Sequence, residues 1–119
     1  MTTYESELTK GNFTLRGKWP HIYITPFLKN LPPDVFGGTG QYDRAPKLVR
    51  LDFGALWTDT FVPTQKSGKP RYFFQDRSFV REFFSRTDAK PGETVLFEQL
   101  TPYHFKLSLR KLDGRVVSS

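Results

Sequence analysis

The chain has 119 residues and a net charge of +6, with 18 Lys and Arg, 12 Asp and Glu, and no cysteine. One domain of this length buries roughly two-thirds of its unfolded surface, so it can fold without disulfides or metal, and the lack of cysteine excludes thiol catalysis and Cys-ligated zinc. The sequence contains neither a signal peptide nor an apolar run near the ~20 residues of a membrane span. We therefore expect a soluble cytoplasmic protein without a membrane partner, and the positive charge favours a polyanion as its partner.

The predicted elements are short strands separated by turns, as twelve Phe, five Tyr, nine Gly and nine Pro indicate. Alternating apolar and polar residues predict seven strands, over residues 13–15, 22–24, 48–53, 56–62, 71–74, 93–97 and 103–109. Short helices are predicted over 26–31 and 77–86, where they interrupt an otherwise all-β chain. This order favours a barrel or curled sheet in a single domain with a core of about 9–111, and the ends, 1–8 and 113–119, are expected to be flexible.

The second helix has the clearer pattern. Asp76 or Ser78 can cap it, and one apolar stripe follows at helical spacing: Phe79, Val80, Phe83 and Phe84. The opposite face carries Arg77, Arg81, Glu82 and Arg86. We interpret this helix as a core element with a solvated charged face.

Residues suited to catalysis are sparse. His21 and His104 are far apart and do not have metal-ligand spacing. The glycines of 37–40 do not lead into Lys-Ser or Lys-Thr, so they do not form a phosphate-binding loop. None of the candidate acids stands in the Glu-x-Lys pattern of a metal-dependent nuclease: Asp52, Asp59, Glu93 and Glu98. We expect no catalytic site, metal or cofactor.

Two segments are basic and contain no acid. Residues 9–25 carry Lys10, Arg16 and Lys18, and residues 62–75, predicted as a hairpin with a basic tip, carry Lys66, Lys69 and Arg71. The second segment also contains Gln65 and Gln75, whose amides can pair with adenine as Arg and Lys pair with guanine. Trp19 is the best candidate for an exposed stacking residue. Both segments therefore favour nucleic acid as the partner.

The order of several short motifs resembles a known family. The motifs are His21–Pro26 followed by Leu31 and Pro32, then Ser78–Glu82, Pro91–Phe97 and Tyr103–Leu107. Together they span residues 8–111 and resemble the B3-like DNA-binding pseudobarrel, which includes plant B3 transcription-factor domains and the effector domains of restriction endonucleases. This resemblance implies an open seven-stranded pseudobarrel that clasps the major groove of DNA between two arms.

The resemblance also implies which residues contact DNA. The first arm would contribute Lys10, Asn12, Thr14, Arg16, Lys18, Trp19 and His21. The second arm would contribute Thr64, Gln65, Lys66, Ser67, Lys69 and Arg71. Within these arms the expected base contacts come from Asn12, Arg16, Gln65, Lys69 and Arg71. Glu93 stands where the family often has Asp, and the plant Trp-Asn-Ser-Ser stretch has no counterpart, which favours the bacterial restriction-enzyme type.

The resulting hypothesis is a monomeric, non-catalytic module that binds double-stranded DNA sequence-specifically, fused to or associated with a nuclease. Three alternatives remain open. One is a small metal-dependent nuclease that uses Asp52, Asp59 and Glu93. The others are a barrel that binds single-stranded nucleic acid or RNA, and an interaction domain whose charge serves solubility.

Overall fold

The computed structural model describes residues 2–13, 19–40 and 42–119. Its strands and single α-helix are β1 (Thr3–Glu7), β2 (Val49–Phe53), β3 (Leu56–Thr60), α1 (Arg77–Thr87), β4 (Thr94–Thr101), β5 (His104–Arg110) and β6 (Val116–Val117). Three single 3₁₀ turns complete the described elements, at Lys10–Asn12, Leu28–Asn30 and Pro33–Val35. The fold is mainly β, as predicted, with six strands in the described residues instead of seven.

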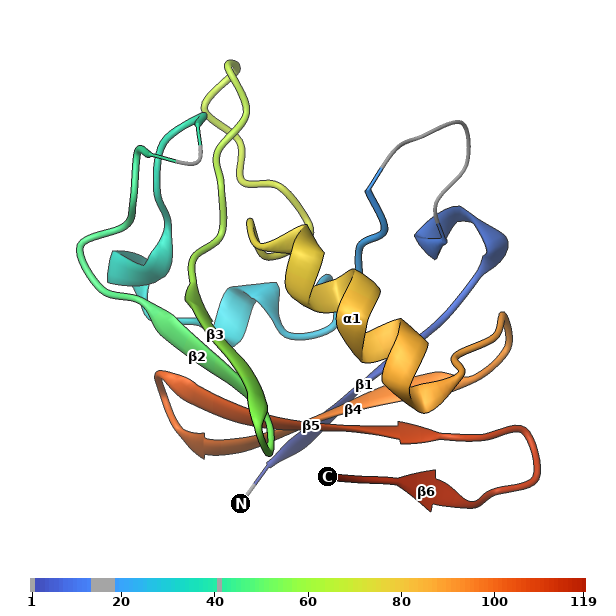
Figure 1. Cartoon of the computed structure of the whole chain (residues 1–119). Helices are drawn as coiled ribbons and strands as arrows, with labels where there is room; N and C mark the ends of the chain where they lie inside the picture. Colours follow the sequence, from blue (N-terminus) through green and yellow to red (C-terminus); the bar gives the residue numbers. More distant parts are fainter. Residues whose placement is uncertain (1, 14–18, 41) are drawn as a thin grey trace.

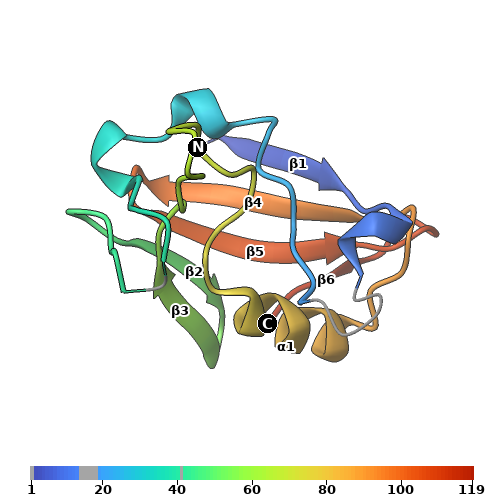
Figure 2. The ribbon, with the colours of Figure 1, turned by 90° about the horizontal axis from the view of Figure 1, so that it is seen from above.

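The six strands form one open mixed sheet (Figures 1 and 2). Five of them follow one another in the order β1-β4-β5-β2-β3, and β6 pairs with β5 outside this order. Neighbours pair antiparallel except β2 and β5, which run parallel with Leu51 opposite Phe105. The first half of β5 pairs with β2, and its last residues pair with β6 on the same side. Within β5, Phe105, Leu107 and Leu109 are fully buried, because alternate residues of a strand face the core.

Two predicted strands are instead irregular segments that link the edges of the sheet. Residues 22–24 and 71–74 lack strand pairing. The Ile24 N–H nevertheless donates to the Tyr72 carbonyl at 2.7 Å, and the Ser6 hydroxyl of β1 donates to the Tyr23 carbonyl at 2.6 Å. On the other side, the Gln75 N–H donates to the Phe61 carbonyl at 2.8 Å, just beyond β3. Isolated hydrogen bonds thus join β1 to β3 through these segments.

Helix α1 confirms the prediction for 77–86, extended by one residue. The Asp76 carboxylate accepts a hydrogen bond from the Phe79 N–H at 3.2 Å, which caps the helix. The helix ends where Asp88 takes the left-handed conformation, with φ of 51°. Its apolar stripe packs into the core, and the Phe83 ring lies 5.1 Å from that of Phe53 on β2.

Three further expectations differ from the structure. The helix predicted over 26–31 is only the 3₁₀ turn Leu28–Asn30, because Pro32 follows at once. Phe13 lies outside any strand, and residues 14–15 of that predicted strand lie outside the described residues. Both ends hold strands, since β1 pairs with β4 and β6 pairs with β5.

In the described part of the chain, α1 is far too short to cross a membrane.

Candidate nucleic-acid interface

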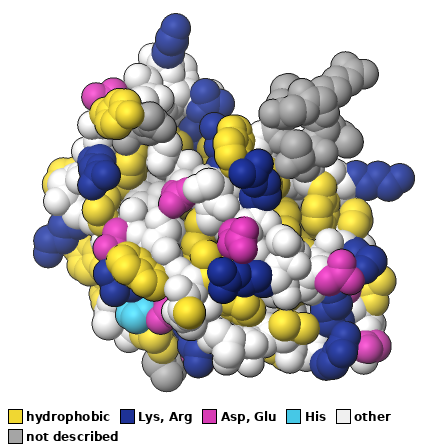
Figure 3. All heavy atoms as spheres, in the orientation of Figure 1, with side chains coloured by type: hydrophobic (Ala, Val, Ile, Leu, Met, Phe, Trp, Pro, Cys, Tyr) yellow, Lys and Arg dark blue, Asp and Glu magenta, His cyan; other side chains and the backbone are white. Residues whose placement is uncertain are grey.

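The two predicted arms rise from the same end of the fold. We call the described residues 10–13 and 19–21 the first arm and residues 63–72 the second arm. Figure 1 shows both above α1, on the side opposite the strands β4 and β5. Figure 3 shows cationic side chains on the second arm and beside the first turns of α1. The fold therefore brings the described residues of the first arm and the basic second arm, which are about forty residues apart in the sequence, to the same end of the molecule.

The second arm is a tight irregular hairpin. Thr64 and Pro70 form an isolated bridge, the Gln65 N–H donates to the Lys69 carbonyl at 2.8 Å, and Gly68 has φ of 90°. This left-handed value suits glycine, which lets the chain reverse in so few residues. Four polar side chains project from the turn as exposed groups: Lys66, Ser67, Lys69 and Arg71.

Thr64 differs from the exposed residues of its arm. Its hydroxyl donates to the Gly37 carbonyl at 2.6 Å, and its N–H donates to the Gly38 carbonyl at 3.0 Å. Both bonds fasten the base of the second arm to the neighbouring 37–40 loop. Thr64 therefore positions the arm, while Gln65, which is half-buried, lies at the start of its turn.

Asn12 holds the base of the first arm. Its side chain is fully buried, its Oδ1 accepts from the Thr9 N–H at 2.7 Å, and its Nδ2 donates to the His21 carbonyl at 2.9 Å. The prediction that Asn12 contacts a base does not fit this geometry, because its amide is engaged inside the protein. Lys10 is exposed, and the predicted contacts Thr14, Arg16 and Lys18 lie outside the described residues.

The far end of the first arm packs against aromatic and arginine side chains. Trp19 is 43% exposed, and the Arg81 guanidinium of α1 lies 4.2 Å from the centre of its ring. His21 is half-buried, with its ring 4.8 Å from Tyr23 and 5.1 Å from Phe73. Burial, followed by repulsion from Arg77, lowers the pKa of His21, although a hydrogen bond to the backbone of Trp19 opposes them. These effects favour the neutral form of the His21 ring.

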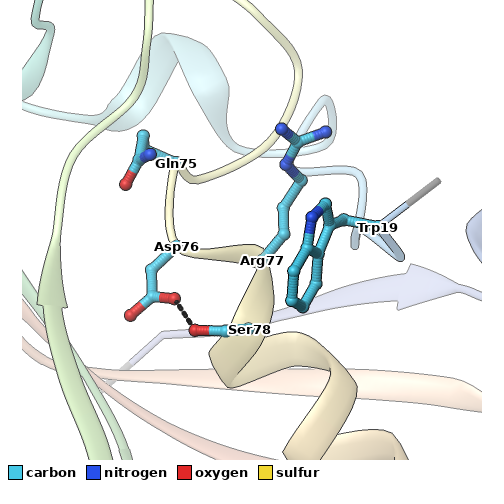
Figure 4. Close-up of a pocket in the computed structure, with 5 residues that line it drawn as sticks. All are labelled: Trp19, Gln75, Asp76, Arg77 and Ser78. Atoms are coloured by element: carbon cyan, nitrogen blue, oxygen red, sulfur yellow. Dashed lines mark hydrogen bonds between the residues drawn. The ribbon is translucent and has the colours of Figure 1, made fainter. Parts of the chain in front are cut away.

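Between the arms lie two adjoining pockets, which we call the interarm hollow. One, of about 220 Å³, is lined by Trp19, Gln75, Asp76, Arg77 and Ser78 (Figure 4). The other, of about 370 Å³, is lined by Thr39, Gly40, Pro63, Arg71, Phe73, Gln75 and Arg77. Gln75 and Arg77 line both pockets, so they stand at the centre of the hollow.

Asp76 fixes the floor of this hollow. Its carboxylate accepts hydrogen bonds of 2.6 Å from the hydroxyls of Thr58 and Ser78, in addition to the helix-capping bond. Its N–H donates to the Thr60 hydroxyl at 3.1 Å. The residues on either side, Gln75 and Arg77, are thereby held in place relative to β3.

No family model, curated protein or solved structure matches this chain. Function is therefore inferred from the side chains that the fold brings to the interarm hollow. Sequence reasoning left Gln75, Arg77 and Arg81 out of the candidate site, because the two arginines fit the solvated face of a helix. One signal was available, since the first turn of α1 carries an arginine and no acid, against the usual preference.

The acids proposed for a nuclease site are engaged elsewhere. Asp59 pairs with Arg50 through contacts of 2.9 and 3.0 Å, and Asp52 lies 3.1 Å from the His104 ring. Glu93 is buried and pairs with Lys111 at 2.9 Å. Across the described ranges, no three His, Asp or Glu side chains are grouped so that they could hold a metal ion. The structure therefore does not bring Asp52, Asp59 and Glu93 together.

Asp76→Ala should lower the free energy of unfolding by about 1–2 kcal/mol, because the helix loses its cap and the Thr58 hydroxyl loses its acceptor. Burial raises the pKa of Asp76, but hydrogen bonds from Ser78, Thr58 and backbone N–H groups outweigh it and lower the pKa. Ionised Asp76 thus stabilises the fold above its unfolded pKa of about 3.9, and this contribution is lost as the pH falls through the folded pKa.

Urea unfolding of the wild type and Asp76→Ala at pH 7 and pH 3 measures this effect. The stability difference should be largest at pH 7 and smaller at pH 3. Asp76→Asn, which retains a good capping group, should lose less than Asp76→Ala. An equal difference at both pH values would contradict the role of the ionised carboxylate.

Proposed function

We propose that this chain is a double-stranded DNA-binding module that reads a short sequence through the major groove as a monomer. The observation that carries the proposal is a polar hollow that contains Arg71 and Arg77 and lies at the base of the second arm, whose turn exposes Lys66 and Lys69. Cationic side chains can neutralise phosphates on both sides of a groove while side chains between them reach base edges.

The proposed architecture is the open seven-stranded pseudobarrel of the B3-like family. In support, residues 22–24 and 71–75 lie between β1 and β3 and are hydrogen-bonded toward both. The seven strands of the pseudobarrel would then be these two segments together with β1, β4, β5, β2 and β3, which follow one another in that order in the sheet. The sequence favours the restriction-enzyme type, so the module would direct or activate a fused or associated nuclease.

Selection from a randomised duplex pool tests this proposal. The purified chain is incubated with the pool at two salt concentrations, with single-stranded competitor present, and the bound duplexes are sequenced. One enriched motif of a few base pairs, bound more weakly at higher salt, supports sequence-specific duplex recognition. Recovery of no motif, or binding that does not change with salt, overturns it, and the latter outcome favours an interaction domain.

Arg71 and Lys66 should differ in their contribution to binding. Arg71 lines the interarm hollow, whereas Lys66 is at the exposed turn of the second arm. Arg71→Ala should cost about 1–3 kcal/mol and relax the sequence preference, while Lys66→Ala should weaken all duplexes alike and reduce the salt slope by about one. Fluorescence anisotropy with the selected duplex and a scrambled duplex measures both effects. Equal losses on the two duplexes for both variants would contradict the assignment of Arg71.

A second candidate function is binding of single-stranded nucleic acid or RNA. Exposed aromatic side chains beside the arms favour it, because Trp19, Tyr23 and Tyr72 are 43%, 38% and 48% exposed. Bases of any sequence can stack on such rings. In the selection experiment, single strands that compete as well as duplex would favour this function.

A further inference from the structure

Arg77 occupies the centre of the interarm hollow in a defined orientation. It is half-buried, lines both pockets, and has its guanidinium 5.4 Å from the centre of the Phe73 ring. Figure 4 shows its side chain extending beside Trp19, while the Asp76 carboxylate is turned toward Ser78. The aromatic neighbours and the helix start restrict this side chain, so little further ordering is needed when it binds a ligand.

The surroundings of Arg77 leave its charge without a counter-charge. Among the described residues, no carboxylate forms an ion pair with it, although Asp76 precedes it in the sequence. The charge of Arg77 lowers the pKa of the neighbouring His21. Arg77 is also the first residue of α1, where a positive charge opposes the helix dipole. Arg77 therefore costs stability where it stands, which is typical of a residue kept for binding.

Gln75 extends the same surface. Its backbone is fixed by the hydrogen bond from its N–H to the Phe61 carbonyl at 2.8 Å, and it lines both pockets with Arg77. Arginine and glutamine are the side chains that pair bidentately with guanine and adenine, respectively, at major-groove edges. Phosphates would instead be met by the exposed cations at the turn of the second arm, Lys66 and Lys69.

We propose that Arg77 is a specificity-determining residue that reads one guanine through its O6 and N7 atoms, with Gln75 contacting an adjacent base pair. This inference rests on the proposed duplex-binding function and adds the residue that does the reading. The exposed turn of the second arm then supplies phosphate contacts that set register, while Arg71, which lines the hollow, contacts a further base. The selected motif should contain a G·C pair whose preference depends on Arg77.

The test repeats the duplex selection with the wild type, Arg77→Ala, Arg77→Lys and Arg86→Ala. Arg86 is the matched control, because it is an exposed arginine on the same helix and pairs with Glu82 at 3.2 Å. Affinities are then measured for the selected duplex and for one in which the G·C pair is replaced by A·T.

The wild type should prefer the selected duplex by about 5- to 150-fold, the discrimination that one bidentate contact provides. Arg77→Ala should remove this preference at one position, keep the rest of the motif and leave the salt slope unchanged. Arg77→Lys should lose at least part of the preference, since a point charge replaces the planar fork. Arg86→Ala should behave as the wild type.

Two results would overturn the inference alone, and a third would overturn the proposed function together with it. If Arg77→Ala keeps the full motif but weakens every duplex equally with a reduced salt slope, Arg77 contacts phosphate. If Arg77→Ala leaves both motif and affinity unchanged, Arg77 makes no contact. If the wild type itself enriches no motif, the proposed function fails and this inference fails with it.

Thermal unfolding of Arg77→Ala separates lost binding from lost structure. Because the wild-type charge opposes the helix dipole, the variant should melt at the same temperature as the wild type or higher. A clearly lower melting temperature would show that Arg77 stabilises the fold, which contradicts the cost argued above.

Discussion

Lys111→Ala is expected to lower the free energy of unfolding by about 3–5 kcal/mol, because it leaves a buried carboxylate without its cation. The Lys111 ammonium donates to the Glu93 carboxylate at 2.9 Å and to the carbonyls of Thr87 and Asp88 at 3.1 and 2.7 Å. The two side chains of the pair are only 11% and 3% exposed. The pair thus ties the end of α1 to the start of β4, and both side chains are largely shielded from water.

The stability difference between the wild type and Lys111→Ala should depend on pH. Burial raises the pKa of Glu93, but the hydrogen bond from Lys111 and those from the N–H groups of Lys90 and Leu112 outweigh it and lower the pKa. In the wild type, ionised Glu93 therefore stabilises the fold above its unfolded pKa of about 4.3, and this is lost as the pH falls through the folded pKa. In Lys111→Ala the pKa should rise, so acid should narrow the stability difference.

Denaturant unfolding at pH 7 and pH 4 measures both effects. Lys106→Ala is the matched control, because Lys106 is exposed on β5 and its removal should change stability by less than about 0.5 kcal/mol. The double variant Glu93→Leu with Lys111→Met should cost much less than Lys111→Ala alone, since no charge stays buried. Equal stability of Lys111→Ala and Lys106→Ala would contradict the importance of the pair.

Phe27→Ala is expected to cost about 3–5 kcal/mol, the usual loss for a phenylalanine deleted from a packed core. Phe27 is 1% exposed, and its ring lies 4.8 Å from Tyr4, 4.9 Å from Phe97 and 5.4 Å from Phe105. These neighbours belong to β1, β4 and β5, so this one ring fastens the irregular segment after the first arm to the sheet.

The same unfolding measurement checks Phe27→Ala. Phe27→Leu, which refills much of the cavity, should lose less than Phe27→Ala. Tyr42→Ala serves as the surface control, because Tyr42 is 87% exposed and its removal should be nearly neutral. A loss below about 1 kcal/mol for Phe27→Ala would mean that the segment is held mainly by its backbone hydrogen bonds.

The elements that the sequence predicts well are those with a complete local pattern. Apolar residues alternate over 48–53 and 103–109, and a helical stripe runs from Phe79 to Phe84. In each of these segments one face is buried, and the structure confirms all three elements. Strand β1 has no such pattern, since its sequence Thr-Tyr-Glu-Ser-Glu is mostly polar and its pairing with β4 is long-range. The alternation over 22–24 reflects burial of Ile22 and Ile24 without any strand partner.

The candidate site was predictable in its composition but not in its geometry. The basic character of both arms follows from residues 9–25 and 62–75 directly. Whether a polar side chain faces outward depends on tertiary contacts, which is why Asn12 is buried at the base of an arm. Long-range contacts hold Arg77 and Gln75 in the hollow, such as the bond of Asp76 to Thr58 on β3, which joins residues 18 positions apart.

The pairing of β1 with β4 has a consequence for how the chain folds. Thr3 aligns with Glu98 and Glu7 with Thr94, and the parallel partners β2 and β5 are also distant along the chain. Long loops must therefore close before these strands gain their contacts, which typically gives folding times of milliseconds to seconds. During synthesis, β1 has no partner until β4 has emerged from the ribosome, so the segment that leads into the first arm is anchored only after the second arm and α1 have been made.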